Sequence, residues 1–252
     1  MSAGVARLGP SIIRRQGLEH WLKRFSSVPV RFLVAPPGFG KTMALLGYLR
    51  HASSRGRYCP VPAGSTSESV WDALRRALHV EQDIRCERDL LAVLGRLAPL
   101  ELALDCQDVP EASGIATILK LVEDLPDDVS VLIACRSRAA FQVGRFVSQG
   151  SAVLCDAERL AFDAAAIRHV AETLSVPFTH RDVLRMLETT DGWPQVVSGA
   201  LRKAAEDSCS MAEALEHWRL RHGHLFNEFV ADALAHVSEH DADLVLKLMS
   251  GS

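Results

Sequence analysis

The sequence predicts an α/β fold in which a mostly parallel five-stranded sheet is covered by helices and followed by an all-α region. Three observations support this prediction. Short apolar runs alternate with amphipathic patterns up to about residue 158, a glycine-rich turn ending in Lys-Thr follows the first run, and the strand signal stops after residue 158. Strands that alternate with helices favour a parallel sheet, because each parallel crossover usually contains a helix.

The individual elements follow from their apolar patterns. Continuous apolar runs indicate strands that are buried on both faces, whereas leucines three or four positions apart indicate the buried side of a helix. We expect strands from residue 30 to the glycine-rich turn and at 57–61, 100–105, 129–135 and 152–154, with helices at 16–25, 42–49, 70–78, 85–97 and 115–125.

Composition narrows the class of protein. Of the 252 residues, 48% are hydrophobic and 23% are charged, as in soluble globular proteins. The formal net charge of −3 argues against a broad positively charged surface that could bind DNA. Neither an apolar run of membrane-spanning length nor a secretory signal is present, so we expect a cytoplasmic protein without membrane contact. The six cysteines lack metal-binding spacing, and His217, His222 and His224 fit an exposed helical turn better than a zinc site.

The glycine-rich turn, Ala35–Thr42, matches a Walker A phosphate-binding loop in which Ala35 replaces the first glycine. Its glycines let several backbone N–H groups converge on one phosphate, and the following helix directs its partly positive N-terminus there. The lysine can reach the β- and γ-phosphates, and the threonine hydroxyl can bind Mg²⁺. The predicted nucleotide-binding residues of this loop are Gly38, Phe39, Gly40, Lys41, Thr42 and Met43.

Two later strands end in residues suited to the same site. Asp105 closes an apolar run in the manner of a Walker B motif, so we predict that it binds Mg²⁺ together with Thr42; a carboxylate that caps the next turn is the alternative. Asp105 and Asp108 are the candidate catalytic carboxylates. Arg136 follows another strand, at the edge where parallel sheets bind ligands, and is predicted to contact the γ-phosphate, with Arg138 as the alternative.

The regions on either side of this core are helical. Upstream, Arg14 or Arg15 could touch the nucleotide base, although solvated arginines are more common at such positions. Downstream, Asp163 is predicted to cap one helix and Thr179 to begin a capping box for the next. The stretch 191–194, Asp-Gly-Trp-Pro, then interrupts the helices and restarts them with proline in the first turn.

Together these motifs resemble the nucleotide-binding module of STAND signal-transduction ATPases, and among them the MalT-type large LuxR regulators. The most specific parts of the resemblance are 33–42, 135–136 and 191–194. It implies a switch that binds ATP or ADP with Mg²⁺, self-associates in its ATP form, and binds DNA only through a C-terminal domain absent from this chain. The implied domains are a P-loop nucleotide-binding domain at 1–158, a helical domain at 159–214 and the start of a winged-helix domain at 215–252.

The resemblance also implies roles for single residues. Lys41 binds the β/γ-phosphates, Arg136 senses the γ-phosphate, and Pro194 packs near the adenine. The resembled family commonly has an acidic residue directly after the Walker B aspartate, and this chain has Cys106 at that position. We therefore expect at most slow ATP hydrolysis, and faster hydrolysis when a carboxylate is introduced there. This expectation fails if Asp108 supplies the base. Three functions stay open: a signalling switch, a P-loop enzyme such as an AAA-type ATPase or small-molecule kinase, and a scaffold with a vestigial nucleotide site.

Overall fold

The computed structural model describes residues 15–51, 55–80, 87–106 and 108–216, which fall into two compact units. The first unit contains the residues up to Ala161 except Pro36–Gly38, and the second contains Pro36–Gly38 together with the residues from Phe162 onward. The break after Ala161 lies close to the predicted boundary at residue 158. The predicted winged-helix segment, 215–252, lies almost entirely outside the described residues, so that assignment stays a prediction.

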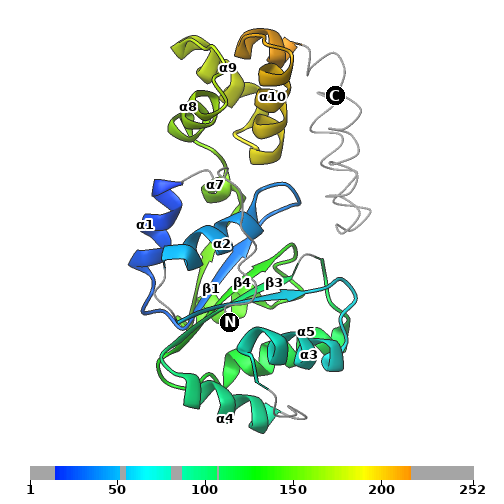
Figure 1. Cartoon of the computed structure of the whole chain (residues 1–252). Helices are drawn as coiled ribbons and strands as arrows, with labels where there is room; N and C mark the ends of the chain where they lie inside the picture. The colour runs from blue at the N-terminus through cyan, green and yellow to red at the C-terminus, as the bar shows by residue number, and fades with distance from the viewer. Residues whose placement is uncertain (1–14, 52–54, 81–86, 107, 217–252) are drawn as a thin grey trace, which may run out of the picture. The chain divides into compact units, whose positions relative to one another are not determined.

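The first unit contains the predicted five-stranded sheet, in which every pairing is parallel. In the strand order β2-β3-β4-β1-β5, strand β4 lies between β1 and β3, so the carboxyl ends of these three strands are neighbours (Figure 1). The predicted site residues that follow β1, β3 and β4 can therefore meet at one edge. The strands are β1 (Val30–Val34), β2 (Gly56–Val61), β3 (Leu100–Cys106), β4 (Val129–Cys135) and β5 (Ala152–Cys155).

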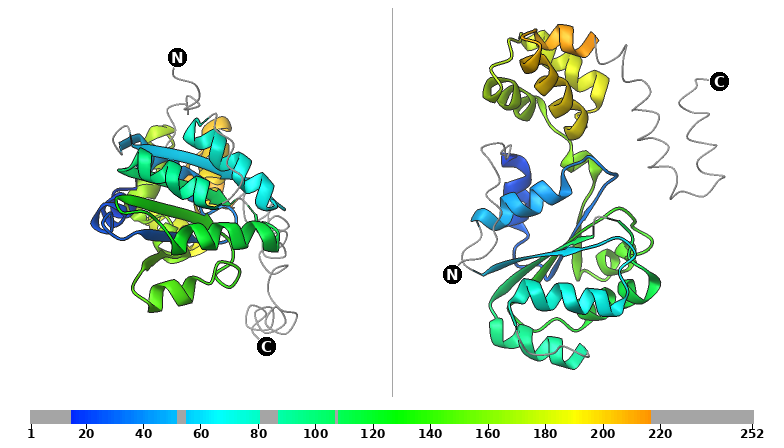
Figure 2. Two further views of the ribbon diagram at one scale, coloured as in Figure 1. Left: turned by 90° about the horizontal axis from the view of Figure 1, so that it is seen from below. Right: turned by 45° about the vertical axis from the view of Figure 1, so that its right-hand side comes forward.

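Helices cover both faces of this sheet. Side chains of α1 and α2 pack in one core cluster, and those of α3, α4, α5 and α6 pack in another; Figure 2 shows α2 and α3 on opposite faces. The short helices α6 and α7 were not predicted, because four to six residues are too few to show a helical period. The helices of this unit are α1 (Gln16–Arg24), α2 (Lys41–His51), α3 (Ser67–Leu78), α4 (Glu87–Leu97), α5 (Ala112–Glu123), α6 (Val143–Ser148) and α7 (Ala157–Leu160).

Strand β3 shows how the two faces differ. Successive side chains of a strand point to opposite faces of the sheet. The leucines of β3 and Cys106 lie in the cluster with α3, α4 and α5, whereas Ala103 lies in the cluster with α1 and α2. By this alternation Glu101 and Asp105 share the face of Ala103, and Asp105 is turned toward the side of the sheet that α2 covers.

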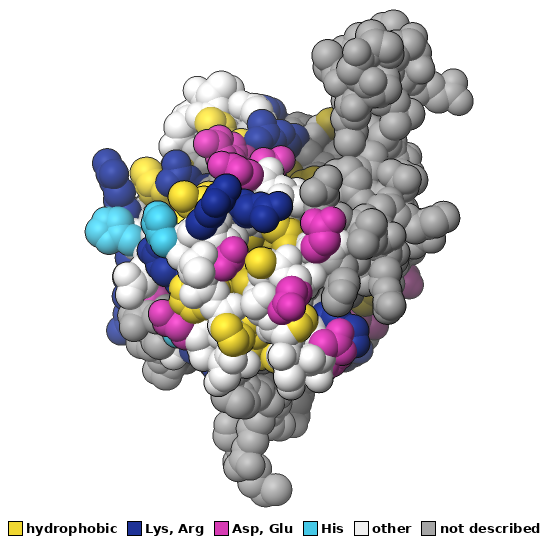
Figure 3. Space-filling view, turned by 90° about the horizontal axis from the view of Figure 1, so that it is seen from above, with side chains coloured by type: hydrophobic (Ala, Val, Ile, Leu, Met, Phe, Trp, Pro, Cys, Tyr) yellow, Lys and Arg dark blue, Asp and Glu magenta, His cyan; other side chains and the backbone are white. Residues whose placement is uncertain are grey.

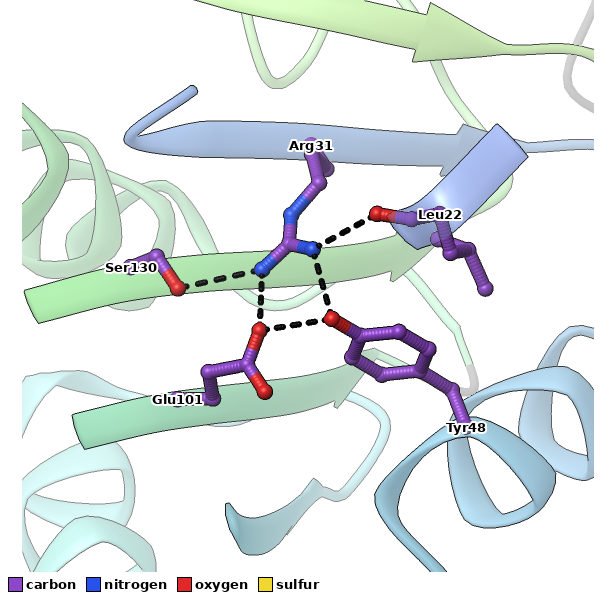
Figure 4. Close-up of polar contacts among 5 residues, drawn as sticks. All are labelled: Leu22, Arg31, Tyr48, Glu101 and Ser130. Carbon is purple, nitrogen blue, oxygen red and sulfur yellow. Dashed lines mark hydrogen bonds and ion pairs between the residues drawn. The ribbon is translucent and has the colours of Figure 1, made fainter. Parts of the chain in front are cut away.

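A buried polar network lies near the amino ends of the strands (Figure 4). Arg31 of β1 is fully buried, and its guanidinium donates to the Oε1 atom of Glu101 at 2.8 Å and to the Oγ atom of Ser130 at 3.0 Å. It also donates to the Leu22 carbonyl at 3.1 Å and to the Tyr48 hydroxyl at 3.0 Å, and that hydroxyl donates to Glu101 at 2.8 Å. The network thus joins α1 and α2 to three strands.

The second unit contains α8 (Ala164–Thr173), α9 (His180–Thr190) and α10 (Pro194–Glu206). Both predicted N-caps are confirmed: Asp163 accepts a hydrogen bond from the third residue of its helix, and Thr179 forms a reciprocal capping box. Pro at the first position of α10 is also confirmed. No helix in the described part of the chain is both long and apolar enough to cross a membrane. On the face that Figure 3 shows, side chains of both charge signs are mixed.

Gly192 fixes the turn between α9 and α10. Its φ is +67°, and a Cβ atom there would lie 2.2 Å from the Phe162 carbonyl oxygen, so neither the backbone conformation nor the space suits a side chain. Phe162 N–H also donates to the Gly192 carbonyl at 2.8 Å. The Asp-Gly-Trp-Pro stretch is therefore a turn whose position is fixed by a backbone hydrogen bond to Phe162, just before α8.

Candidate functional site

The loop between β1 and α2 has the backbone that its sequence predicts. Gly38 and Gly40 have φ values of +80° and +69°, in the region that glycine adopts readily. The Gly40 carbonyl accepts the N–H of Ala44 at 2.9 Å, so helical hydrogen bonding starts inside the loop. The first helical turn of α2 can therefore present its free N–H groups to an anion, as predicted for a phosphate-binding loop.

Lys41 stands at the centre of the candidate site. Its side chain is buried, and Nζ donates to the Ala35 carbonyl at 2.6 Å. Burial lowers the pKa of this ammonium to about 8; the positive charge of Arg136 acts in the same direction, while Cys135 and Asp105 oppose the shift. Asp105 and Arg136, each predicted from the end of a different strand, therefore both lie close enough to Lys41 for their charges to act on its ammonium. Lys41 and Arg136 thus offer two positively charged side chains that can bind phosphate oxygens.

Asp105 is almost completely buried, with 1% of its surface exposed. Its Oδ2 atom accepts a hydrogen bond of 2.7 Å from the hydroxyl of Tyr58, which lies on the neighbouring strand β2. Burial and the hydrogen bond to Asp105 both raise the pKa of the Tyr58 phenol, so the phenol stays protonated and remains a donor. No sequence motif marks Tyr58, which lies within the strand predicted at 57–61.

Arg136 and Asp108 form a pair. An Nη1 atom of Arg136 lies 3.7 Å from Oδ2 of Asp108, and the two side chains are 22% and 37% exposed. Asp108 also accepts the N–H of Val109 on its other oxygen at 2.8 Å. The alternative arginine, Arg138, pairs instead with Asp156 at 3.7 Å on the surface. The predicted sensor and the predicted base therefore lie together.

Arg15 lies against the outer side of the loop. It donates to the carbonyls of Phe39 at 3.2 Å, Gly40 at 3.3 Å and Leu160 at 2.8 Å, and burial lowers its pKa to about 10. In a trans peptide the C=O and the N–H point in opposite directions. Holding the Phe39 and Gly40 carbonyls therefore turns the N–H groups of Gly40 and Lys41 away from Arg15. The structure gives Arg15 this supporting contact, and a contact with the base stays a prediction, as does any role of Arg14, which lies outside the described residues.

The remaining predicted loop residues are half-buried. Thr42 and Met43 lie in the first turn of α2, and Phe39 packs against the core cluster of α1 and α2. Thr42 and Asp105 offer a hydroxyl and a carboxylate, the hard oxygen donors that Mg²⁺ prefers. Among the described residues no group of three or more His, Cys, Asp or Glu could hold a metal ion. The donor types fit Mg²⁺ held jointly with a phosphate.

Within the second unit, Gly38 contacts the start of α10. Its carbonyl accepts the N–H of Gln195 at 3.1 Å, and a Cβ atom at Gly38 would lie 2.5 Å from the indole nitrogen of Trp193. Pro194, which lies between Trp193 and Gln195 in the sequence, is buried at the first position of α10. Its predicted contact with the adenine stays a prediction.

Cys106 does not lie where the sequence interpretation placed it. The thiol is fully buried in the core cluster on the face opposite Asp105, and this burial raises its pKa well above the usual range. The alternation of β3 is the cause, because consecutive residues of a strand cannot face the same side. Position 106 therefore contributes to packing, and a missing carboxylate there says little about hydrolysis.

This placement reverses the expected effect of a carboxylate at position 106. Cys106→Asp should destabilise the protein by about 3 kcal/mol or more, because it buries a carboxylate without a partner, while Cys106→Ala should cost only about 1 kcal/mol. Urea unfolding followed by circular dichroism measures both changes. An aspartate variant as stable as the alanine variant, with faster ATP turnover, would restore the original interpretation.

Solved structures of other proteins share the fold of this chain, although no family model and no curated protein matches its sequence. A Walker-type ATPase of Pyrococcus abyssi superposes with a TM-score of 0.60 at 12% identity, over 86% of this chain and 74% of its own. The chain has the P-loop NTPase fold.

Two further structures share this fold. A STAND protein of Pyrococcus horikoshii with a tetratricopeptide repeat sensor has a TM-score of 0.53 at 12% identity, over 71% of this chain and 28% of its own. A mutant RuvB of Thermotoga maritima has a TM-score of 0.51 at 11% identity, over 81% of this chain and 66% of its own. The chain thus spans little more than a quarter of the STAND protein. At such identities the likeness concerns the P-loop NTPase fold alone.

Proposed function

We propose that this protein binds ATP or ADP with Mg²⁺ and acts as a nucleotide-dependent switch. The observation that carries the proposal is the convergence of Lys41, Asp105 and Arg136 at the carboxyl edge of β1, β3 and β4, beside a loop with two positive-φ glycines. Backbone N–H donors at the start of a helix, together with the positively charged side chains of Lys41 and Arg136, suit phosphates. A carboxylate beside it suits the accompanying cation, which would neutralise phosphate charge.

Each residue has a separate task in this proposal. The N–H groups of Gly40 and Lys41, oriented by Arg15, bind the β-phosphate, and the Lys41 ammonium leaves the Ala35 carbonyl to bind the β- and γ-phosphates. Thr42 and Asp105 would hold Mg²⁺ through their oxygen atoms. Arg136 turns from Asp108 toward the γ-phosphate.

The finer proposal is a signalling role like that of MalT-type STAND regulators. It is supported by the motif resemblance and by the fold shared with a STAND protein. In this role the nucleotide state controls conformation, the ATP form self-associates, and DNA is bound through a C-terminal domain beyond these residues. Sedimentation velocity with ADP and with a non-hydrolysable ATP analogue tests it, and equal sedimentation coefficients would count against the switch.

An ATPase enzyme is the second candidate. The specific observation in its favour is Asp108, which is partly exposed and lies beside Arg136, where a base for the attacking water is needed. The fold shared with a Walker-type ATPase agrees with this candidate. Single-turnover hydrolysis by the wild type and by Asp108→Asn separates the two functions, because brisk turnover that the substitution abolishes identifies an enzyme.

The nucleotide assignment has a direct test. The purified protein is denatured, and released nucleotide is identified by chromatography, with ADP expected for a resting switch. Protein that releases no nucleotide and also gives no heat with ADP or ATP in isothermal titration refutes the proposal.

We expect Arg136→Ala to remove discrimination between nucleotides. ADP affinity should stay within about twofold of the wild type, while ATP affinity should fall about tenfold, the usual worth of one charge-assisted hydrogen bond. The reason is that the γ-phosphate alone is expected to reach the end of β4. Isothermal titration measures both affinities, with Arg138→Ala as the matched control because that arginine pairs on the surface with Asp156. Equal losses for ADP and ATP would contradict the sensor role.

A further inference from the structure

The hydrogen bond between Tyr58 and Asp105 crosses from β2 to β3 on the face that α2 covers. In the strand register Tyr58 lies opposite Ala103, and Asp105 lies opposite Pro60, two residues farther along β2. The tyrosine side chain therefore reaches toward the carboxyl edge of the sheet, and its hydroxyl meets Oδ2 of Asp105 at 2.7 Å. Pro60, the residue directly opposite Asp105, has no backbone donor and no polar side chain to offer.

This contact fixes the orientation of a carboxylate that is 1% exposed. A carboxylate has two oxygens that rotate about one bond, and a donor on Oδ2 limits this rotation. Oδ2 already accepts a hydrogen bond from the phenol, so Oδ1, which keeps both of its lone pairs for other partners, is the oxygen better suited to a cation. Without the phenol, the carboxylate would be free to turn toward the nearby Lys41 ammonium, with which it already interacts through charge.

We propose that Tyr58 is a positioning residue that orients the Asp105 carboxylate for Mg²⁺ and so couples nucleotide binding to Mg²⁺. The inference rests on the proposed nucleotide site, and it adds a residue on a strand that no Walker motif includes. Groups that orient metal-binding side chains commonly change metal affinity by tenfold or more when removed.

The chain contains two tyrosines, which supplies a matched control. Tyr48 also donates its hydroxyl to a carboxylate of β3, that of Glu101, at 2.8 Å. Glu101 lies near the amino end of β3, whereas Asp105 lies near its carboxyl end. Tyr48→Phe and Tyr58→Phe therefore each remove one oxygen atom from a similar bond, at opposite ends of the same strand.

The experiment measures ADP affinity by isothermal titration with Mg²⁺ and with EDTA for the wild type, Tyr58→Phe and Tyr48→Phe. Circular dichroism checks that each variant is folded. For Tyr58→Phe, we expect the Mg²⁺ concentration that produces a given increase in ADP affinity to be about tenfold higher than for the wild type. The ADP affinity of this variant in EDTA should stay within about twofold of the wild-type value. Tyr48→Phe should leave the Mg²⁺ dependence unchanged.

The outcomes separate this inference from the proposed function. A wild type that binds ADP and a Tyr58→Phe variant with an unchanged Mg²⁺ dependence overturn the positioning role alone. A loss that is equal in Mg²⁺ and in EDTA, or shared by Tyr48→Phe, also overturns it, since a purely structural effect would act in that way. A wild type that binds ADP under neither condition overturns the proposed function and the positioning role together.

Discussion

Lys41→Ala should reduce the affinity for both ADP and ATP at least about 100-fold, to below detection in isothermal titration. The substitution removes the buried ammonium that compensates phosphate charge, and charge-assisted hydrogen bonds of this kind contribute about 1.5–3 kcal/mol each. Burial lowers the pKa of Lys41, so the folded protein does not stabilise its charge, and removing that charge offsets the loss of the hydrogen bond to the Ala35 carbonyl. The variant should therefore unfold within a few degrees of the wild type. Loss of binding would therefore not reflect loss of fold.

Two controls isolate the charge. Lys120→Ala removes an exposed lysine that lies 3.6 Å from Glu87, and it should leave nucleotide affinity unchanged. In the wild type, measured in EDTA, ADP affinity should be nearly constant between about pH 7, where the terminal phosphate is mostly ionised, and about pH 8, and it should fall at higher pH, where the Lys41 ammonium loses its proton. Each further pH unit can cost at most about tenfold. An unchanged affinity in Lys41→Ala would eliminate the phosphate-loop assignment.

The fold was predictable because parallel strands buried on both faces leave long apolar runs in the sequence. Strand β4 is an example, since its observed limits, Val129–Cys135, are those predicted. The N-cap at Asp163, the capping box at Thr179 and the proline of α10 were predictable for another reason: each depends only on residues within one helical turn of the helix start. Helices α6 and α7 were missed because they are too short to show a period.

The site was predictable only in part. Lys41, Asp105 and Arg136 could be assigned to one edge of the sheet, because parallel strands align their carboxyl ends. The side on which each residue faces required the strand period, and applying that period to Leu-Glu-Leu-Ala-Leu-Asp-Cys would have placed Cys106 with the leucines. Tyr58 could not be found in this way, because its partner lies on another strand and the register between strands is absent from the sequence.

The sequence contains a signal for the network around Arg31. Arg31, Glu101 and Ser130 are each the second residue of a predicted apolar strand. Polar residues at the same position of several buried strands indicate one layer of polar contacts across the sheet. The reason is that buried polar side chains need hydrogen-bond partners, and at this position they can find them in one another. The signal cannot name the helical partners of the layer, Tyr48 and the Leu22 carbonyl, which depend on how α1 and α2 pack.

Removing the guanidinium of this network should have the largest effect on stability. Arg31→Ala should lower the free energy of unfolding by about 3–5 kcal/mol, because it leaves the Glu101 carboxylate, 22% exposed, without its positive partner and the Leu22 carbonyl without its donor. That is a large share of the 5–15 kcal/mol that typically stabilises a folded domain. Urea unfolding monitored by circular dichroism measures the loss.

A surface pair and a double-mutant cycle show whether the network itself is responsible. Arg75→Ala breaks an exposed pair with Asp72 at 2.9 Å and should cost less than about 1 kcal/mol. Glu101→Gln in the Arg31→Ala background should recover part of the loss, because it removes the carboxylate charge that the first substitution leaves unpaired. If Arg31→Ala costs no more than Arg75→Ala, the buried guanidinium does not stabilise the sheet against α1 and α2, and these helices are held by apolar packing alone.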